Sequence, residues 1–286
     1  MPRLMQTLRV GAAALSFAAT MNFAAAQESK GDPAPDTRVA EGYLKRGRYE
    51  DAIRQSKLAL GRDERYVPAM IVLAKAYYNN KKYELAGQII DIAKQIDPNN
   101  PELYNLLGFL ALTRNDRIGA TSSFKKATEV DGNFAPGWIN LTAQYLYAKN
   151  YDGAVQAGEK AVHLQPNSKT HMNLGSAYRG AKKYTDADKA FKKALEFDPQ
   201  NGSVYFNLGI LYLDAKDYPG VDLMQRNNLA INYLTRYRQL SAARMGKDDP
   251  VDGYLAEARK AIENEQKRLD RLKKQQERNQ PKAGGK

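Results

Sequence analysis

Residues 168–201 read SKTHMNLGSAYRGAKKYTDADKAFKKALEFDPQN, and this stretch decides the fold because its spacing recurs along the chain. Alanine returns in the same register at Ala52, Ala86, Ala120, Ala154 and Ala187, and again seven residues later at Ala59, Ala93, Ala127, Ala161 and Ala194. A third series of small residues precedes the first by twelve: Ala40, Ala74, Gly108, Thr142, Gly175 and Gly209. The period is 34 residues, once 33, which indicates an array of repeated structural units.

The small residues have a physical reason. Two helices that cross at close separation leave no room for a side chain at the crossing point, so alanine or glycine is expected there. Tyrosines recur at the wider positions, three residues beyond the small one, and we interpret them mainly as core: Tyr77, Tyr145, Tyr178 and Tyr212. The alternative is that such a stripe stacks on a ligand. The pattern predicts helix pairs that bury their apolar faces against neighbouring pairs.

This pattern resembles the tetratricopeptide repeat, with a large residue at the fourth place of each unit, as at Trp138 and Tyr104, and often proline near the end. The units are residues 33–66, 67–100, 101–134, 135–168 and 168–201, followed by a sixth over 202–240, so that the array covers 33–240. The resemblance implies an all-α, right-handed α-solenoid of about six tetratricopeptide helix pairs. It also implies a concave groove lined by the first helix of each pair.

The C-terminal part departs from the period. Ala230 stands where residue 221 would, which predicts an insertion over 219–228, interpreted as a surface loop with a lip on the groove as the alternative. Asp249 and Pro250 then predict the start of a capping helix over 249–266. Residues 267–286 form a basic run that we expect to be a partly disordered tail.

The N-terminus has the features of a secretory signal peptide over residues 1–26. Arg3 and Arg9 precede an apolar run, and Ala24 to Ala26 supply small residues for cleavage after Ala26. A flexible leader is expected over 27–36. Because the chain has no cysteine, no lipid can be attached at a cleavage-site cysteine, and a soluble periplasmic protein, not a lipoprotein, is expected. Export also argues against nucleic acid as the partner of a chain with net charge +12.

The residues of common catalytic sites are scarce. The chain has two histidines and no cysteine, and it contains no phosphate-binding glycine loop and no nucleophile elbow. We therefore expect a protein that is not an enzyme and uses no cofactor or metal. His171, at the large fourth place of a first helix, is interpreted as a packing residue.

The predicted partner-binding site lies on first helices of units four to six. Asn140, Asn173 and Asn207 share the sixth place, and in tetratricopeptide proteins that this chain resembles such a ladder holds an extended peptide by its backbone. The apolar neighbours are Phe109, Ile139, Met172, Phe206 and Ile210, and the cations that favour an acidic segment are Lys75, Lys169 and Arg179. The alternative is that the apolar set packs against the next helix.

These features predict a non-catalytic periplasmic scaffold or adaptor. Residues 229–233 and 249–255 are similar to the ends of periplasmic tetratricopeptide components of adventurous gliding motility machinery, which implies an envelope-spanning machine with protein partners. Two alternatives remain: an envelope-binding module whose basic tail contacts anionic lipid or cell-wall polymer, and a pilus or secretion assembly factor.

Overall fold

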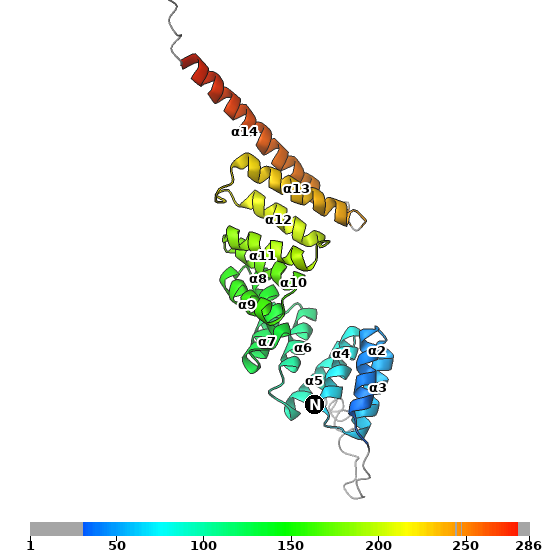
Figure 1. The fold of residues 1–286 in the computed structure, drawn as a ribbon. Coiled ribbons are helices and arrows are strands. Elements are labelled where there is room, and N and C mark those ends of the chain that lie inside the picture. The colour runs from blue at the N-terminus through cyan, green and yellow to red at the C-terminus, as the bar shows by residue number, and fades with distance from the viewer. Residues whose placement is uncertain (1–30, 244, 247, 280–286) are drawn as a thin grey trace, which may run out of the picture.

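The computed structural model describes residues 31–243, 245–246 and 248–279, which form an elongated stack of helix pairs (Figure 1). The first helices of the six units are α2 (Ala34–Lys45), α4 (Val67–Asn79), α6 (Pro101–Thr113), α8 (Ala135–Tyr147), α10 (Ser168–Gly180) and α12 (Gly202–Asp214). The second helices are α3 (Tyr49–Arg62), α5 (Tyr83–Ile96), α7 (Arg117–Val130), α9 (Tyr151–Leu164), α11 (Tyr184–Phe197) and α13 (Leu223–Ser241), and α14 (Val251–Asn279) ends the array. The predicted all-α solenoid is confirmed.

The crossing points within the pairs are as close as the small residues indicated. A Cβ atom added at Gly108 would lie 2.4 Å from the ring of Phe124, and one at Gly175 would lie 2.6 Å from the ring of Phe191. Both rings are fully buried. Each glycine therefore makes space for an aromatic side chain of the second helix, which places the core between the helices of each pair.

The turns inside the pairs share one backbone conformation. In five units a residue of the turn has positive φ, between 57° and 72°, at Gly47, Lys81, Asn115, Lys149 and Lys182. Glycine and asparagine adopt this left-handed region readily, whereas lysine does so at a conformational cost. The repeated turn thus imposes the same reversal of direction whatever residue occupies it.

In the sixth unit, the insertion predicted as a loop over 219–228 is only partly a loop. The turn after α12 spans residues 215–222, and residues 223–228 form the first turns of α13, which has 19 residues against 14 in α11. Asp222 and Gln225 form a capping box that starts this longer helix, since each side chain accepts a hydrogen bond from the other's backbone N–H. Arg226 is buried and donates to the carbonyl oxygens of Tyr212 and Leu213, so the inserted residues cap α12.

A buried polar cluster joins the fifth unit to the sixth. Asp188 is 5% exposed, and its carboxylate accepts hydrogen bonds from the hydroxyl of Tyr212 at 2.8 Å and from Nζ of Lys192 at 2.7 Å. Burial, followed by the hydrogen bond to Asp188, raises the pKa of Tyr212 above its ordinary value. The hydroxyl therefore keeps its proton and remains the donor to the carboxylate.

The last helix starts as predicted and covers the end of the array. Asp249 accepts a hydrogen bond from the backbone N–H of Val251 at 3.0 Å, as a helix cap does. Val251, Leu255 and Ala258 are buried, and the first two pack on Leu234 of α13. The early part of α14 is therefore the expected cap.

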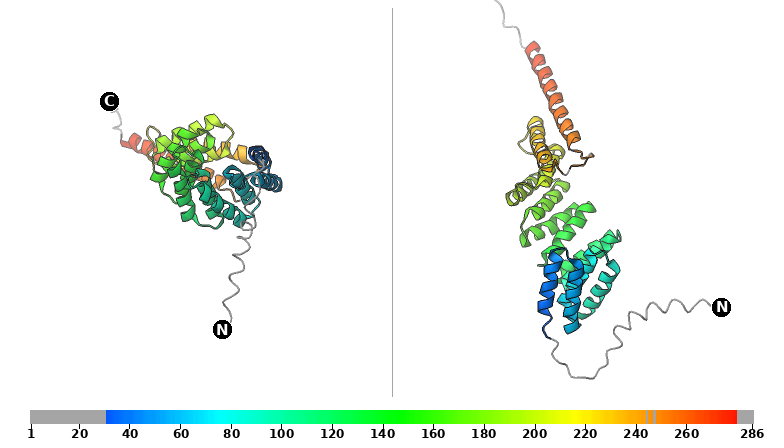
Figure 2. Two further views of the ribbon diagram at one scale, coloured as in Figure 1. Left: turned by 90° about the horizontal axis from the view of Figure 1, so that it is seen from below. Right: turned by 90° about the vertical axis from the view of Figure 1, so that its right-hand side faces the viewer.

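The predicted tail disorder is wrong for residues 267–279, which continue α14 to Asn279 as a helix that projects from the body (Figure 2). Ion pairs one turn apart support it, between Glu263 and Lys267 and between Glu265 and Arg268. Arginine, lysine, glutamine and glutamate are also good helix formers. Residues 280–286 lie outside the described residues.

The N-terminal predictions fall largely outside the described part of the chain. The signal peptide over 1–26 lies there entirely, and the leader expected over 27–36 overlaps α2, which already begins at Ala34. Pro35 in the first turn explains this start, because proline is pre-organised for the beginning of a helix. Among the residues described, no helix combines the length and the apolar character needed to cross a membrane.

Candidate partner-binding groove

The first helices line one side of the array. Each contacts the first helix of the next unit, from α2 with α4 through to α12 with α14, whereas in the described part of the chain the second helices of neighbouring units bring no Cα atoms within 8 Å of each other. Elements that approach each other more closely lie on the inner side of a curved stack. The helices α8, α10 and α12, which carry most of the predicted site residues, therefore lie on the concave side.

The three asparagines of the predicted ladder differ in how far they are already paired. Nδ2 of Asn140 donates to Oδ1 of Asn105 at 2.8 Å, and Nδ2 of Asn207 donates to the carbonyl oxygen of Ser203 on its own helix at 2.8 Å. Asn173 is half-buried, and its side-chain amide makes no hydrogen bond among the described residues. The amide of Asn173 on α10 is thus unpaired within the described chain, whereas those of Asn140 and Asn207 on either side each already donate one hydrogen bond.

Asn105 is a site residue that the repeat register missed. It is 4% exposed on α6, one place before Leu106, where the ladder position carries a leucine. Other units place apolar residues in the register of Asn105, among them Ile139 and Met172. Only the approach of α6 to α8 shows that its amide faces Asn140, and no sequence signal announces this.

The predicted apolar neighbours are largely engaged in packing. Phe109 lies between the rings of Tyr78 and Phe124, at centroid distances of 6.1 and 5.4 Å. Met172 packs on the core shared by α11 and α12. Ile139 is half-buried. What these three side chains offer a partner is limited to the fraction that packing leaves exposed.

Phe206 and Ile210 were predicted as apolar contacts for a partner in unit six, but the structure packs both against other helices. The ring of Phe206 contacts the rings of Tyr237 and Tyr254, with centroids 5.0 and 6.0 Å away, and Ile210 packs on the cluster around Leu234. The alternative that this set packs against the next helix holds here, because the capping helix α14 occupies the place of a further first helix.

The three predicted cations have different surroundings. Lys75 forms an ion pair with Glu102 at 3.1 Å, and Lys169 is exposed. Arg179 lies 3.9 Å from Asp214, at the outer limit of an ion pair. Its Nη1 atom is buried with no hydrogen-bond acceptor in the described structure. The side chain as a whole is 26% exposed, so an acceptor from a partner can reach its exposed nitrogens but not the buried Nη1.

A surface depression of about 540 Å³ surrounds Arg179, and we call it the Arg179 pocket. It spans units four to six and is lined by Leu146, Tyr151, Ser176, Arg179, Gly180, Lys182, Tyr184 and Asp214. Gly180 is needed for its shape, because a Cβ atom there would lie 2.1 Å from the ring of Tyr151. Two cations and one carboxylate thus line a site at the C-terminal ends of the first helices α8, α10 and α12, beside the turns that lead into the second helices.

Asp214 is a weak intramolecular partner for Arg179. Burial raises the pKa of Asp214, the charge of Arg179 opposes that rise, and the charge of Glu257 on α14 adds to it. A carboxylate with a raised pKa gives up its negative charge more readily than an exposed one. Because Asp214 lies 3.9 Å from Arg179, at the outer limit of an ion pair, a carboxylate from outside that approaches Arg179 more closely would compete with it.

Comparison with known proteins agrees with this architecture. Family models described as tetratricopeptide repeat match residues 43–108, 168–201 and 190–221. Among curated relatives, the BBSome complex member BBS4 homolog of Drosophila melanogaster is 21% identical over 67% of this chain and 40% of its own length. Protein O-mannosyl-transferase TMTC3 of Homo sapiens is 28% identical over 48% of this chain and 16% of its own length. The chain thus spans less than half of these relatives.

Solved structures show the same fold. The APC/C hetero-tetramer Cut9–Hcn1 superposes with a TM-score of 0.62 at 19% identity, covering 81% of this chain and 44% of that one. Pseudomonas aeruginosa pilF has a TM-score of 0.62 at 19% identity, covering 73% of this chain and 92% of that one. Proteins built from these repeats generally mediate protein–protein interaction and scaffolding. This chain therefore contains tetratricopeptide repeats, which the family models match over residues 43–108 and 168–221.

Proposed function

We propose that the protein is a non-catalytic periplasmic adaptor that binds an acidic, extended segment of a partner protein in the concave groove of units four to six. The proposal includes export by the signal peptide over residues 1–26 and service in an envelope-spanning machine such as that of gliding motility. The short likeness of residues 229–233 and 249–255 to gliding components supports that machine. Intact mass of the exported protein, with Gln27 as its first residue, tests the localisation.

The observation that supports partner binding in the groove is that polar side chains on α10 have unused hydrogen-bonding capacity. Asn173, Ser176 and Arg179 are spaced three residues apart and form a slanted row along this helix. The amide of Asn173 can both donate to and accept from a peptide backbone, and the partly exposed guanidinium of Arg179 has its nearest carboxylate 3.9 Å away. Neutral and charged groups with unused hydrogen-bonding capacity in one row suit an extended chain that carries a carboxylate.

The proposal is tested with a fluorescein-labelled, glutamate-rich extended peptide and its lysine counterpart, using fluorescence anisotropy. Asn173→Ala is expected to weaken binding of the acidic peptide by about 1 to 2 kcal/mol, the scale of one lost hydrogen-bonding group. Arg179→Gln is expected to weaken it by about 1.5 to 3 kcal/mol, because the lost partner is charged. Asp214→Asn should tighten binding, since it removes the competing carboxylate.

Lys189→Gln is the matched control for Arg179→Gln, because Lys189 is an exposed cation on the second helix α11. It should leave affinity unchanged. Equal binding of the lysine peptide, or unchanged affinity in a triple alanine variant of Asn140, Asn173 and Asn207, would move the site elsewhere. The identity of the machine is then addressed by capturing partners with the wild-type protein and with this triple variant in parallel.

A second candidate function rests on the projecting end of α14. Leu269 and Leu272 are 40% and 42% exposed and lie one turn apart. The opposite side carries Lys267, Arg271 and Lys274, so this segment is a basic helix with a narrow apolar stripe. Helices of this kind bind anionic surfaces, which favours contact with an anionic lipid or polymer of the envelope.

Deletion of residues 267–286 separates the two functions. It should abolish binding to vesicles that contain phosphatidylglycerol, and that binding should fall steeply with salt. Anisotropy with the acidic peptide should stay nearly unchanged. Vesicle binding that survives the deletion would exclude the helix as the envelope contact.

A further inference from the structure

The first unit exposes a position that inner units bury. Val39 on α2 is 46% exposed, whereas four of the five residues in the same register of later units are buried: Leu73, Leu141, Leu174 and Leu208, at 2%, 3%, 7% and 0% exposed. The fifth, Leu107, is half-buried. In unit two this position packs on Ala52 and Ile53 of α3, the second helix of the preceding unit. Unit one has no preceding unit within the described residues. The side of α2 that would receive a second helix is therefore open.

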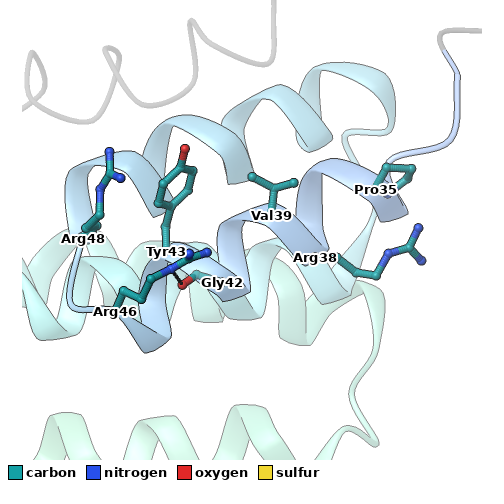
Figure 3. Close-up of a pocket in the computed structure, with 7 residues that line it drawn as sticks. All are labelled: Pro35, Arg38, Val39, Gly42, Tyr43, Arg46 and Arg48. Atoms are coloured by element: carbon teal, nitrogen blue, oxygen red, sulfur yellow. Dashed lines mark hydrogen bonds between the residues drawn. The ribbon is translucent and has the colours of Figure 1, made fainter.

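Six residues define this surface, here named the N-terminal face: Pro35, Arg38, Val39, Gly42, Tyr43 and Arg46. Together with Arg48 they line a depression of about 600 Å³ (Figure 3). Val39 and Tyr43 stand side by side along α2, and Pro35 extends the apolar stripe toward the start of the helix. The register positions of Pro35 and Gly42 are also buried in unit two, at Ala69 and Ala76.

The charges of the N-terminal face are only partly neutralised. The guanidinium carbons of Arg48 and Arg46 lie 4.5 and 5.7 Å from the centroid of the Tyr43 ring, and Arg46 Nε donates to the carbonyl oxygen of Gly42 at 2.9 Å. Arg48 is paired with Asp51, Nε to Oδ2 at 2.6 Å. Within the described chain, Arg38 and Arg46 have no carboxylate partner. An apolar stripe is thus flanked by two guanidinium groups whose charge is uncompensated.

We propose that the N-terminal face binds an acidic amphipathic helix of a partner protein, seated where inner units place the second helix of the preceding unit. The repeat register supplies the shape, because each later first helix contacts the second helix of the preceding unit, and the register positions of Pro35 and Gly42 are buried in every later unit. The two uncompensated guanidinium groups supply the charge preference. A second copy of this chain does not fit, since its exposed helical segment, the end of α14, is itself basic. This interaction is separate from the concave groove.

The chain has no cysteine, so a single introduced thiol reports the occupancy of the face. The V39C variant of the full chain is labelled with a maleimide with and without a helical probe peptide that carries leucine on one side and glutamate on the other. The I118C variant is the matched control, because Ile118 is 86% exposed on α7, far from α2 in the array. We expect the acidic peptide to slow labelling of V39C and to leave I118C unchanged.

Charge reversal tests the recognition. Adding R38E and R46E to V39C should weaken the peptide's protection by about tenfold or more, because like charges then face each other. Reversal of Lys126 and Lys189, exposed cations on α7 and α11, should have little effect. Protection by the lysine counterpart, equal protection of I118C, no protection by the acidic peptide, or insensitivity to R38E and R46E would overturn the proposal. Protection by phosphatidylglycerol vesicles but not by the peptide would also overturn it and assign the face to a lipid surface.

Discussion

Replacing one crossing-point glycine by alanine tests how closely the helix pairs approach. Gly175 lies in the middle of α10, and an added Cβ atom would lie 2.6 Å from Cδ1 and Cε1 of Phe191. Gly87 lies inside α5, and an added Cβ atom would meet only Cδ1 of Leu110 at 3.7 Å, an ordinary contact. Glycine-to-alanine substitution at these two helical sites thus differs mainly in how closely the added methyl group approaches its neighbours.

The expected magnitudes follow from these distances. Carbon atoms pack best at about 3.5 to 4.0 Å, so the fully buried ring of Phe191 would have to retreat by about 1 Å. Overpacking of this kind costs about 1 to 3 kcal/mol. At both sites alanine gains about 1 kcal/mol over glycine in helix propensity. Gly87→Ala should therefore stabilise the protein by about 1 kcal/mol, and Gly175→Ala should be less stable than Gly87→Ala by about 1 to 3 kcal/mol.

Urea unfolding of both variants gives the comparison. Circular dichroism follows the whole array, and fluorescence of Trp138, the only tryptophan, follows unit four beside the substituted unit. The second probe is needed because repeat arrays can unfold in parts. An equal gain in stability for Gly175→Ala and Gly87→Ala would refute the close packing of Phe191 on α10.

Three further predictions concern stability. Asp188→Ala leaves the buried hydroxyl of Tyr212 without its acceptor and should cost about 1 to 3 kcal/mol in urea unfolding, with strong coupling to Tyr212→Phe in a double-mutant cycle. The folded chain holds the Tyr212 proton to higher pH than the unfolded chain, so the free energy of unfolding should fall above about pH 10, and Tyr212→Phe should flatten that fall. Lys149→Gly relieves a positive φ of 57° and should raise the midpoint of thermal unfolding, by up to about 1 kcal/mol in stability, whereas Lys189→Gly inside α11 should lower it.

The array itself was predictable because packing imposes the same demand on every unit. Ala86 and Ala154 are small for one reason, the helix crossing, and that reason repeats at a fixed period. His171 follows the same logic: it was expected to pack, and it stacks on Phe197 at a centroid distance of 5.4 Å. Such constraints leave a periodic trace in the sequence, which gives the units and their core.

Features that occur once in the chain were harder to predict. The capping box of Asp222 and Gln225 was visible in the sequence and would have placed a helix where a loop was expected. The helical end of α14 is indicated by Glu263 and Lys267, spaced four apart, but the run of like charges after them favours a disordered tail in the sequence alone. The pairing of Asn105 with Asn140 depends on how two units are set against each other, and neither residue's neighbours in sequence carry that information.

At each end of the described array, a helix pair has an apolar face with no neighbouring pair to bury it, and the two ends differ in how far that face is covered. At the C-terminal end Leu234 is fully buried beneath Val251 and Leu255 of α14. At the N-terminal end Val39 stays 46% exposed, although full burial of such a side chain contributes about 1.5 to 3 kcal/mol. Roughly half of that free energy is therefore unrealised in the described chain. It becomes available to whatever covers α2, which is why an exposed face at the end of the described array is a place to look for a partner.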